Sequence, residues 1–217
     1  MIMGKYMRIL NIAVFWFVVL CVGYAENDTA LPEFGKDTVL VWETQIQDSK
    51  TTFVVRIASF YPNRLLEWED RISQGTVFIS NQNILEANSY VNNNLFKQGM
   101  DTRSDNETTL WLSRKTFKTL KEKKKVNCKI DRVPGKLTYE GEDALSVEVN
   151  GSLANLPVIK VRDDRGSEKW FLDDGNNPVL MKYIRRYYNQ TLVSITTNRP
   201  NTLRWLKGQK LERLLKQ

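Results

Sequence analysis

The sequence predicts a mainly β protein with minor α, built as a strongly curved antiparallel sheet or open half barrel with one or two helices. Most of the chain alternates apolar and polar residues with period two, as half-buried strands require. Turn-forming residues separate these runs at hairpin spacing, and only two short stretches favour a helix. About ten strands joined by short turns indicate a curled sheet, with a regular β-sandwich as the alternative.

Residues 1–25 have the features of a secretory signal segment. Lys5 and Arg8 precede an apolar run, and Gly23 and Ala25 provide the small residues of a cleavage site. The apolar run is about 14 residues long, whereas a bilayer span needs roughly 20. We therefore expect cleavage near Ala25 and a periplasmic or secreted product, which would be membrane-anchored if the segment were retained.

Residues 26–217 are expected to form a single globular β-rich domain. Their number is sufficient for one domain with a substantial core and small for two. Cys128 is the one cysteine of this part, so no disulfide within the chain is expected. We interpret its thiol as a small buried apolar group, with a reactive thiol beside the neighbouring lysines as the alternative.

The first half of this domain predicts a meander of four antiparallel strands. Trp42 and Trp68 lie on the apolar faces of two of them, and Pro62 and Asn63 supply a turn. The four predicted strands span 39–47, 52–61, 65–72 and 76–80.

Helices are expected only in the middle of the chain. The Asn-rich stretch 81–94 suits a short helix followed by a loop. Ser113 has the features of an N-cap. A short basic helix is therefore predicted from Arg114 to about Lys125, lying on the surface with most of its lysines in water.

The second half predicts further strands paired through hairpins. Asp and Gly residues form one turn over 162–166, and Asp, Asn and Pro form a longer one over 173–178. The predicted strands span 108–112, 136–140, 144–150, 156–162, 169–172, 179–188 and 191–197.

The positive charge of the chain is concentrated in two segments. The formal net charge is +7, and the basic residues gather in 114–129 and in the amphipathic segment 199–217. Such runs are typical of solvated faces, and the functional alternative is contact with anionic lipid or envelope polymer. The lysines predicted to touch such an anionic surface are Lys118, Lys121, Lys123, Lys124 and Lys125. An exported protein is not expected to bind nucleic acid.

The sequence contains little that could carry catalysis. It has no histidine, which excludes Ser/His/Asp and Cys/His arrangements and the usual zinc sites. It has no Gly-rich phosphate loop, and its Asp-rich turn lacks the spacing of a calcium loop, so neither a cofactor nor a metal is expected. Paired carboxylates could still hydrolyse a polysaccharide. The candidates are Glu67, Glu69, Asp163, Asp164, Asp173 and Asp174.

Aromatic residues supply the remaining candidate site. In a curled sheet, inward-facing aromatic side chains either fill the core or line an apolar groove for a hydrophobic ligand. The residues assigned to such a groove are Trp42, Trp68, Trp111, Trp170 and Phe171.

Part of the second half resembles a known structural family. Lys160-Val161-Arg162-Asp163-Asp164 is followed by Lys169-Trp170-Phe171-Leu172-Asp173 and then by Asn177-Pro178-Val179. This order, over residues 135–197, resembles uncharacterised bacterial periplasmic domains related to the lipoprotein-carrier half barrel. The resemblance implies a strongly curved antiparallel sheet, a helix across its open side and an apolar concave face. The Asn-rich middle and the basic helix have no counterpart in that family.

The sequence therefore favours an exported envelope protein that is not an enzyme and that binds or carries a lipid-like or other hydrophobic ligand on the concave face of its sheet. Two alternatives stay open. One is a structural or assembly protein of the envelope without a small ligand, and the other is a carboxylate-based polysaccharide hydrolase. The sequence does not assign an oligomeric state.

Overall fold

The structure, a computed structural model, describes residues 30–92, 95–96, 101–103 and 106–197. The predicted signal segment and the basic segment 199–217 lie outside these residues. The strands are β1 (Val39–Ile46), β2 (Ser49–Ser59), β3 (Arg64–Glu69), β4 (Gln74–Ile79), β5 (Ser89–Tyr90), β6 (Asp101–Arg103), β7 (Lys125–Ile130), β8 (Val133–Val149), β9 (Ser152–Asp163), β10 (Glu168–Leu172), β11 (Leu180–Arg185) and β12 (Tyr188–Thr196). The helices are α1 (Asn81–Glu86) and α2 (Arg114–Lys123).

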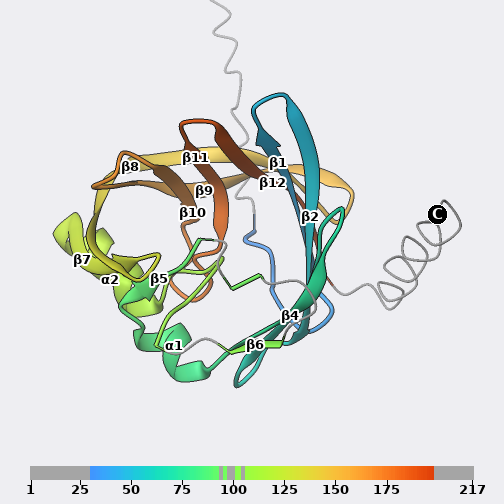
Figure 1. Ribbon diagram of the computed structural model, residues 1–217, viewed down its shortest axis with the longest axis horizontal. Coiled ribbons are helices and arrows are strands. Elements are labelled where there is room, and N and C mark those ends of the chain that lie inside the picture. The colour runs from blue at the N-terminus through green and yellow to red at the C-terminus, as the bar shows by residue number, and fades with distance from the viewer. Residues whose placement is uncertain (1–29, 93–94, 97–100, 104–105, 198–217) are drawn as a thin grey trace, which may run out of the picture.

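All the strands belong to one strongly curved sheet, which confirms the predicted fold class (Figure 1). The strand order is β5-β7-β8-β9-β10-β11-β12-β1-β2-β3-β4-β6. Most neighbours are antiparallel, and the expected meander is present as β1 to β4. The pairs β4–β6, β5–β7 and β8–β12 are parallel, so the sheet is mixed. The curl brings β12 against β8, where Ser194 pairs with Glu148 and Ile195 with Val149.

Several sequence predictions differ from the observed elements. The short strands β5 and β6 were not predicted, and the strand predicted over 179–188 ends at Arg185, so that Tyr188 already begins β12. Residues 108–112 form only isolated bridges, at Thr108 and Trp111, because Leu110 has a left-handed backbone with φ 58° that interrupts a strand. The two strands predicted over 136–140 and 144–150 are one continuous strand, β8, with an irregularity between Tyr139 and Gly141.

A further difference is β7, a six-residue strand that was also not predicted. Its alternating Val126, Cys128 and Ile130 are flanked by lysines, and the basic run obscured the period-two pattern. The preceding helix α2 consequently ends at Lys123, and Lys124 turns the chain with φ 61°. Lys125 already belongs to β7.

The start of α2 confirms the predicted N-cap. The Ser113 Oγ accepts a hydrogen bond from the backbone N–H of Thr116 at 3.1 Å. Phe117 and Leu120 form the buried face of the helix, while Arg114, Lys115 and Lys118 are exposed. The helix therefore lies on the surface with most of its basic side chains exposed, as the sequence predicted.

The apolar residues form two clusters on opposite faces of β9, β10 and β11. One cluster contains the inward residues of β1 to β4, such as Leu40 and Val55, together with Leu156 and Leu172. The other contains residues of α2 and β7 together with Ile159, Phe171 and Tyr183. Adjacent residues of these strands therefore enter opposite clusters, as Val158 and Ile159 do on β9, while Lys160 and Arg162 of the same strand remain partly exposed.

Candidate ligand-binding site

One end of the curved sheet contains a cavity on its inner face. Its volume is about 220 Å³. Its walls come from β1, β2 and β12, from β3 and the residue that follows it, and from Phe96 in a loop between β5 and β6. The lining residues are Thr44, Ile46, Thr51, Phe53, Trp68, Asp70, Phe96, Tyr188 and Gln190.

The period-two geometry of the strands explains how these residues meet. On β1 the inward residues are Ile46, Thr44 and Trp42, and their exposed fractions fall from 50% to 7% to 0%. Burial increases in the same way along β12, from half-buried Tyr188 to buried Gln190 and fully buried Leu192. The cavity therefore opens at the turn end of the strands and is closed at depth by core residues.

The strand register sets a polar row across the cavity. Thr44 on β1 is the backbone partner of Gln190 on β12 and of Thr51 on β2. The next deeper row contains Leu192, Trp42 and Phe53, which are apolar. The cavity thus has one band of hydrogen-bonding side chains above an apolar base.

Three aromatic rings form a continuous wall beside this polar row. The ring centroids of Phe53 and Phe96 are 4.9 Å apart and those of Trp68 and Phe96 are 5.7 Å apart, both in edge-to-face contact. The Phe53 and Trp68 rings are 6.1 Å apart. These distances are typical of favourable aromatic pairs, so the wall is rigid and apolar.

Two buried polar atoms of the lining residues have no hydrogen-bond partner among the described residues. They are the Gln190 Oε1, an acceptor, and the Trp68 Nε1, a donor. Buried polar groups in proteins are nearly always paired, so unpaired ones beside a cavity indicate a place for a polar ligand group or water.

Asp70 is the one ionisable carboxylate of the lining, and no basic residue accompanies it. The Asp70 Oδ1 accepts hydrogen bonds from the backbone N–H groups of Ile72 and Ser73, at 2.9 and 2.6 Å. This carboxylate therefore organises the β3–β4 turn at the cavity mouth.

Of the five aromatic residues predicted to bind a ligand, the structure places Trp68 in the cavity wall. Trp42 lies one row deeper, is fully buried and donates from its Nε1 to the Leu180 carbonyl at 3.0 Å. Trp111 and Trp170 belong to the same buried cluster but lie outside the cavity lining. Phe171 belongs to the second cluster, on the opposite face of the sheet.

Trp111 is covered by a buried arginine. The Arg64 guanidinium lies 4.5 Å from the Trp111 ring centroid and 4.8 Å from that of Phe60, and its Nη2 donates to the Asn177 Oδ1 at 2.8 Å. Burial and, to a smaller extent, the charge of Arg114 lower the pKa of Arg64 to about 9, against the opposing effect of Asp174. Arg64 therefore stays charged at neutral pH as part of the packed interior.

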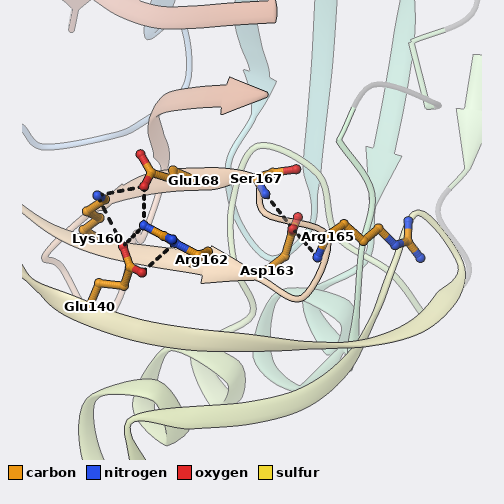
Figure 2. A network of polar contacts seen from close by, with 7 residues as sticks. All are labelled: Glu140, Lys160, Arg162, Asp163, Arg165, Ser167 and Glu168. Carbon is orange, nitrogen blue, oxygen red and sulfur yellow. Dashed lines mark hydrogen bonds and ion pairs between the residues drawn. The ribbon is translucent and has the colours of Figure 1, made fainter. Parts of the chain in front are cut away.

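Trp170 lies beside a network of surface charges. Figure 2 shows four members of this network, Glu140, Lys160, Arg162 and Glu168. Lys160 Nζ and Lys182 Nζ each lie 5.1 Å from the Trp170 ring centroid. Lys160 also pairs with Glu140 at 3.2 Å and with Glu168 at 3.0 Å, and Arg162 pairs with both acids at 2.6 Å. The charges of Lys160 and Arg162 are balanced by those of Glu140 and Glu168, and Lys182 adds one positive charge beside Trp170.

A buried ion pair lies at the turn between β9 and β10. The fully buried Lys169 donates from its Nζ to the Asp163 Oδ2 at 2.7 Å. The Asp163 Oδ1 accepts from the N–H groups of Arg165 and Ser167, as Figure 2 shows. Burial alone would raise the pKa of Asp163, but the hydrogen bond and charge of Lys169 and the backbone N–H groups lower it below its ordinary value. Burial in turn lowers the pKa of Lys169, against the effect of Asp163. The pair fixes the hairpin that the sequence predicted there.

The five lysines predicted to meet an anionic surface differ in their surroundings. Lys121 bridges Glu142 and Asp173, both at 2.8 Å. Lys118 lies 3.8 Å from Glu122, and Lys124 lies over the Tyr139 ring at 3.9 Å. Lys123 and Lys125 are exposed. Acidic neighbours therefore offset part of the positive charge of this face.

Four of the six carboxylates considered for hydrolysis make structural contacts. Glu67 accepts hydrogen bonds from the buried Arg56, and Asp163 and Asp173 hold Lys169 and Lys121. Asp174 accepts from the backbone N–H of Asn176 at 2.7 Å. In the described part of the chain, no group of three Cys, Asp or Glu residues is placed to hold a metal ion.

The Cys128 thiol is buried, as the sequence analysis expected. Burial raises the pKa of Cys128 to about 11, and Lys169 opposes this rise. The thiol is therefore protonated at neutral pH and is a poor nucleophile.

Sequence reasoning missed most of the cavity lining. Thr44 and Gln190 occupy inward positions of apolar strands, and an inward polar residue on such a face is the signal that could have found them. Phe96 follows an Asn-rich loop, and no periodicity connects it to the strands.

No helix within the described ranges has the length and apolar character needed to cross a membrane. Comparisons of the chain with protein-family models, with curated proteins and with solved structures find no match. The resemblance to lipoprotein-carrier-like domains therefore stays a prediction.

Proposed function

We propose that this chain is an exported, non-catalytic binding protein that takes the apolar part of a small amphiphile into the cavity beside Trp68. The observation that carries the proposal is the row of Thr44, Thr51 and Gln190 facing an aromatic wall, with the Gln190 Oε1 unpaired. A ligand with an apolar body and one hydrogen-bonding group complements such a surface.

The size of the cavity limits what enters it. A cavity of about 150 Å³ is enough for benzene, whereas pockets that enclose a whole drug-sized ligand measure roughly 300–1,000 Å³. The observed 220 Å³ therefore suits one ring or a short alkyl segment. The remainder of a longer lipid-like ligand would lie outside, along the cavity mouth.

The charge of the lining favours a neutral or cationic polar group. Asp70 is the single charged side chain of the lining, and a carboxylate disfavours a nearby anion. Aromatic rings such as Trp68 and Phe53 also attract cations through their faces. Among ligands with the same tail, we therefore expect those with a cationic or neutral polar group to bind more tightly than those with an anionic group.

The proposal of a non-catalytic role rests on the same side chains. The only acid of the lining, Asp70, already accepts two backbone hydrogen bonds, and the lining has no lysine, arginine or cysteine to act as a base or nucleophile. Export remains part of the proposal because of the segment 1–25, with the mature protein placed in the periplasm or outside the cell.

Calorimetric titration with three octyl compounds tests the proposal. Octanol, octanoate and octyltrimethylammonium share one tail, and we expect octanoate to bind most weakly. Thr51→Leu fills the cavity and should abolish binding. Thr52→Leu, its neighbour on the exposed face of β2, is the matched control and should bind as the wild type does. If both variants bind equally well, or if the wild type does not bind, the cavity is not a ligand-binding site. A structural or assembly role would then be the better assignment.

A further inference from the structure

Three turns surround the mouth of the cavity, and each presents a large apolar side chain to solvent. Ile46 next to the β1–β2 turn is 50% exposed, Ile72 in the β3–β4 turn is 79% exposed and Tyr187 in the β11–β12 turn is 60% exposed. Single exposed apolar residues are common on protein surfaces. Three that converge on one cavity mouth call for a shared explanation.

Contacts between these turns place them at one end of the sheet. The backbone N–H of Gln47 donates to the Tyr187 carbonyl at 3.1 Å, which joins the first turn to the third. Ile46 and Tyr188 are register partners and both line the cavity. Asp70, the first residue of the β3–β4 turn, lines it too. In Figure 1 the β1–β2 and β11–β12 turns project from the same side of the molecule.

Exposed cations accompany each apolar tip. Lys50 follows the first turn, Arg71 precedes Ile72, and Arg185 and Arg186 precede Tyr187. Lys50 and Arg71 form no ion pair with any described residue, while the Arg186 guanidinium lies 5.0 Å from the Tyr187 ring centroid. The acids of the same turns are Asp48 and Asp70, so this end has two more positive than negative side chains.

We propose that this end of the protein docks on an anionic lipid bilayer, with Ile46, Ile72 and Tyr187 inserted at the interface and the neighbouring cations on the headgroups. Apolar tips gain free energy by entering the acyl boundary, and basic residues at the surface of an anionic leaflet add to it. The tips belong to separate projecting turns and make no flat contiguous patch, which suits a deformable lipid surface better than a folded protein partner.

Docking in this orientation places the cavity mouth against the membrane. An amphiphile could then pass between bilayer and cavity without exposing its tail to water. This passage rests on the proposed function, whereas docking itself does not require a filled cavity.

Co-sedimentation with lipid vesicles tests the docking surface. The probe is a set of vesicles of phosphatidylcholine with and without phosphatidylglycerol, mixed with the exported protein. We expect binding to vesicles that contain phosphatidylglycerol and weaker binding in high salt. Arg71→Gln with Arg186→Gln should weaken binding about fivefold for each residue changed. Ile72→Ser with Tyr187→Ser should weaken it on both kinds of vesicle.

The chain offers matched controls. Tyr61 in the β2–β3 turn and Leu153 at the start of β9 are exposed apolar residues away from the three turns, and Tyr61→Ser with Leu153→Ser should bind as the wild type does. Lys118→Gln with Lys123→Gln tests the competing basic face of α2. Melting curves establish that each variant is folded, since exposed substitutions of this kind alter stability little.

The proposal is overturned if the wild type does not bind anionic vesicles, or if the turn variants bind them as well as the wild type does. In the latter case the contact lies on α2 or in the segment 199–217. Titration of the same variants with the octyl compounds separates the two proposals. A turn variant that loses vesicle binding but still binds the octyl compounds affects docking and leaves the cavity intact.

Discussion

Thr44 and Gln190 are backbone partners on neighbouring strands, and both side chains line the cavity at the inner face of the sheet. They are 7% and 2% exposed, and the Gln190 Oε1 has no hydrogen-bond partner among the described residues. A buried acceptor without a partner costs free energy in the empty protein and becomes useful when a ligand donates to it.

Gln190→Met should therefore leave the protein at least as stable as the wild type while reducing affinity for a hydroxyl-bearing ligand such as octanol. Methionine keeps the length of the side chain and removes the unpaired acceptor. Urea unfolding followed by calorimetric titration measures both effects. A variant that is destabilised by several kcal/mol would mean that the amide makes a structural contact in the folded protein.

Trp42 and Trp68 should respond differently to replacement by alanine. Trp42 is fully buried and hydrogen-bonded to the Leu180 carbonyl, so Trp42→Ala should cost about 3 to 5 kcal/mol of unfolding free energy. Trp68 borders the cavity on one side, so Trp68→Ala should cost less and should lower ligand affinity more. Equal losses of stability in urea titrations would identify Trp68 as an ordinary core residue.

The Asp163–Lys169 pair should be costly to break from one side. Lys169→Met leaves a buried carboxylate without its cation, and we expect a loss of about 3 to 5 kcal/mol. Adding Asp163→Asn should restore much of this loss, because the amide oxygen still accepts from the N–H groups of Arg165 and Ser167. Lys160→Met, in the exposed network, should cost about 1 kcal/mol or less. Additive losses in the double variant would show that the pair is not coupled.

Asp163 also predicts a specific response to acid. Its pKa is lowered in the folded protein, so its ionised form contributes stability above its unfolded pKa, and this contribution is lost as the pH falls through the folded value. Melting temperatures should therefore fall on acidification, and less steeply in Asp163→Asn. If the melting temperatures of the wild type and the variant fall equally steeply with decreasing pH, other carboxylates control the acid response.

The sequence predicted the fold class because period-two alternation follows directly from strand geometry. The meander from β1 to β4 and the hairpins after β8 have local turns that the residues themselves indicate. What the sequence could not predict is contact between segments far apart in the chain. The parallel pairing of Ser194 with Glu148 depends on how strongly the whole sheet curls.

The sequence predicted an aromatic-lined site on the inner face of the sheet, but of the five residues assigned to it only Trp68 lines the cavity. The tryptophans on inward faces were identified, but alternation alone does not say where the core ends and a cavity begins. Trp42 and Trp68 lie on similar apolar strand faces, and only the packing of Phe96 and the end of β3 distinguish their surroundings. The polar row at Thr44 is formed by residues of three strands, and a single strand's alternation does not show that they are neighbours.

Native mass spectrometry of the protein purified gently from the cells that produce it tests the central claim most directly. The account predicts an excess mass on the wild type that disappears on mild activation and that corresponds to a small amphiphile. Folded Thr51→Leu should lack this mass, whereas Thr52→Leu should retain it. A wild type that carries no ligand, or a Thr51→Leu variant that carries the same one, would contradict the assignment of the cavity as a binding site.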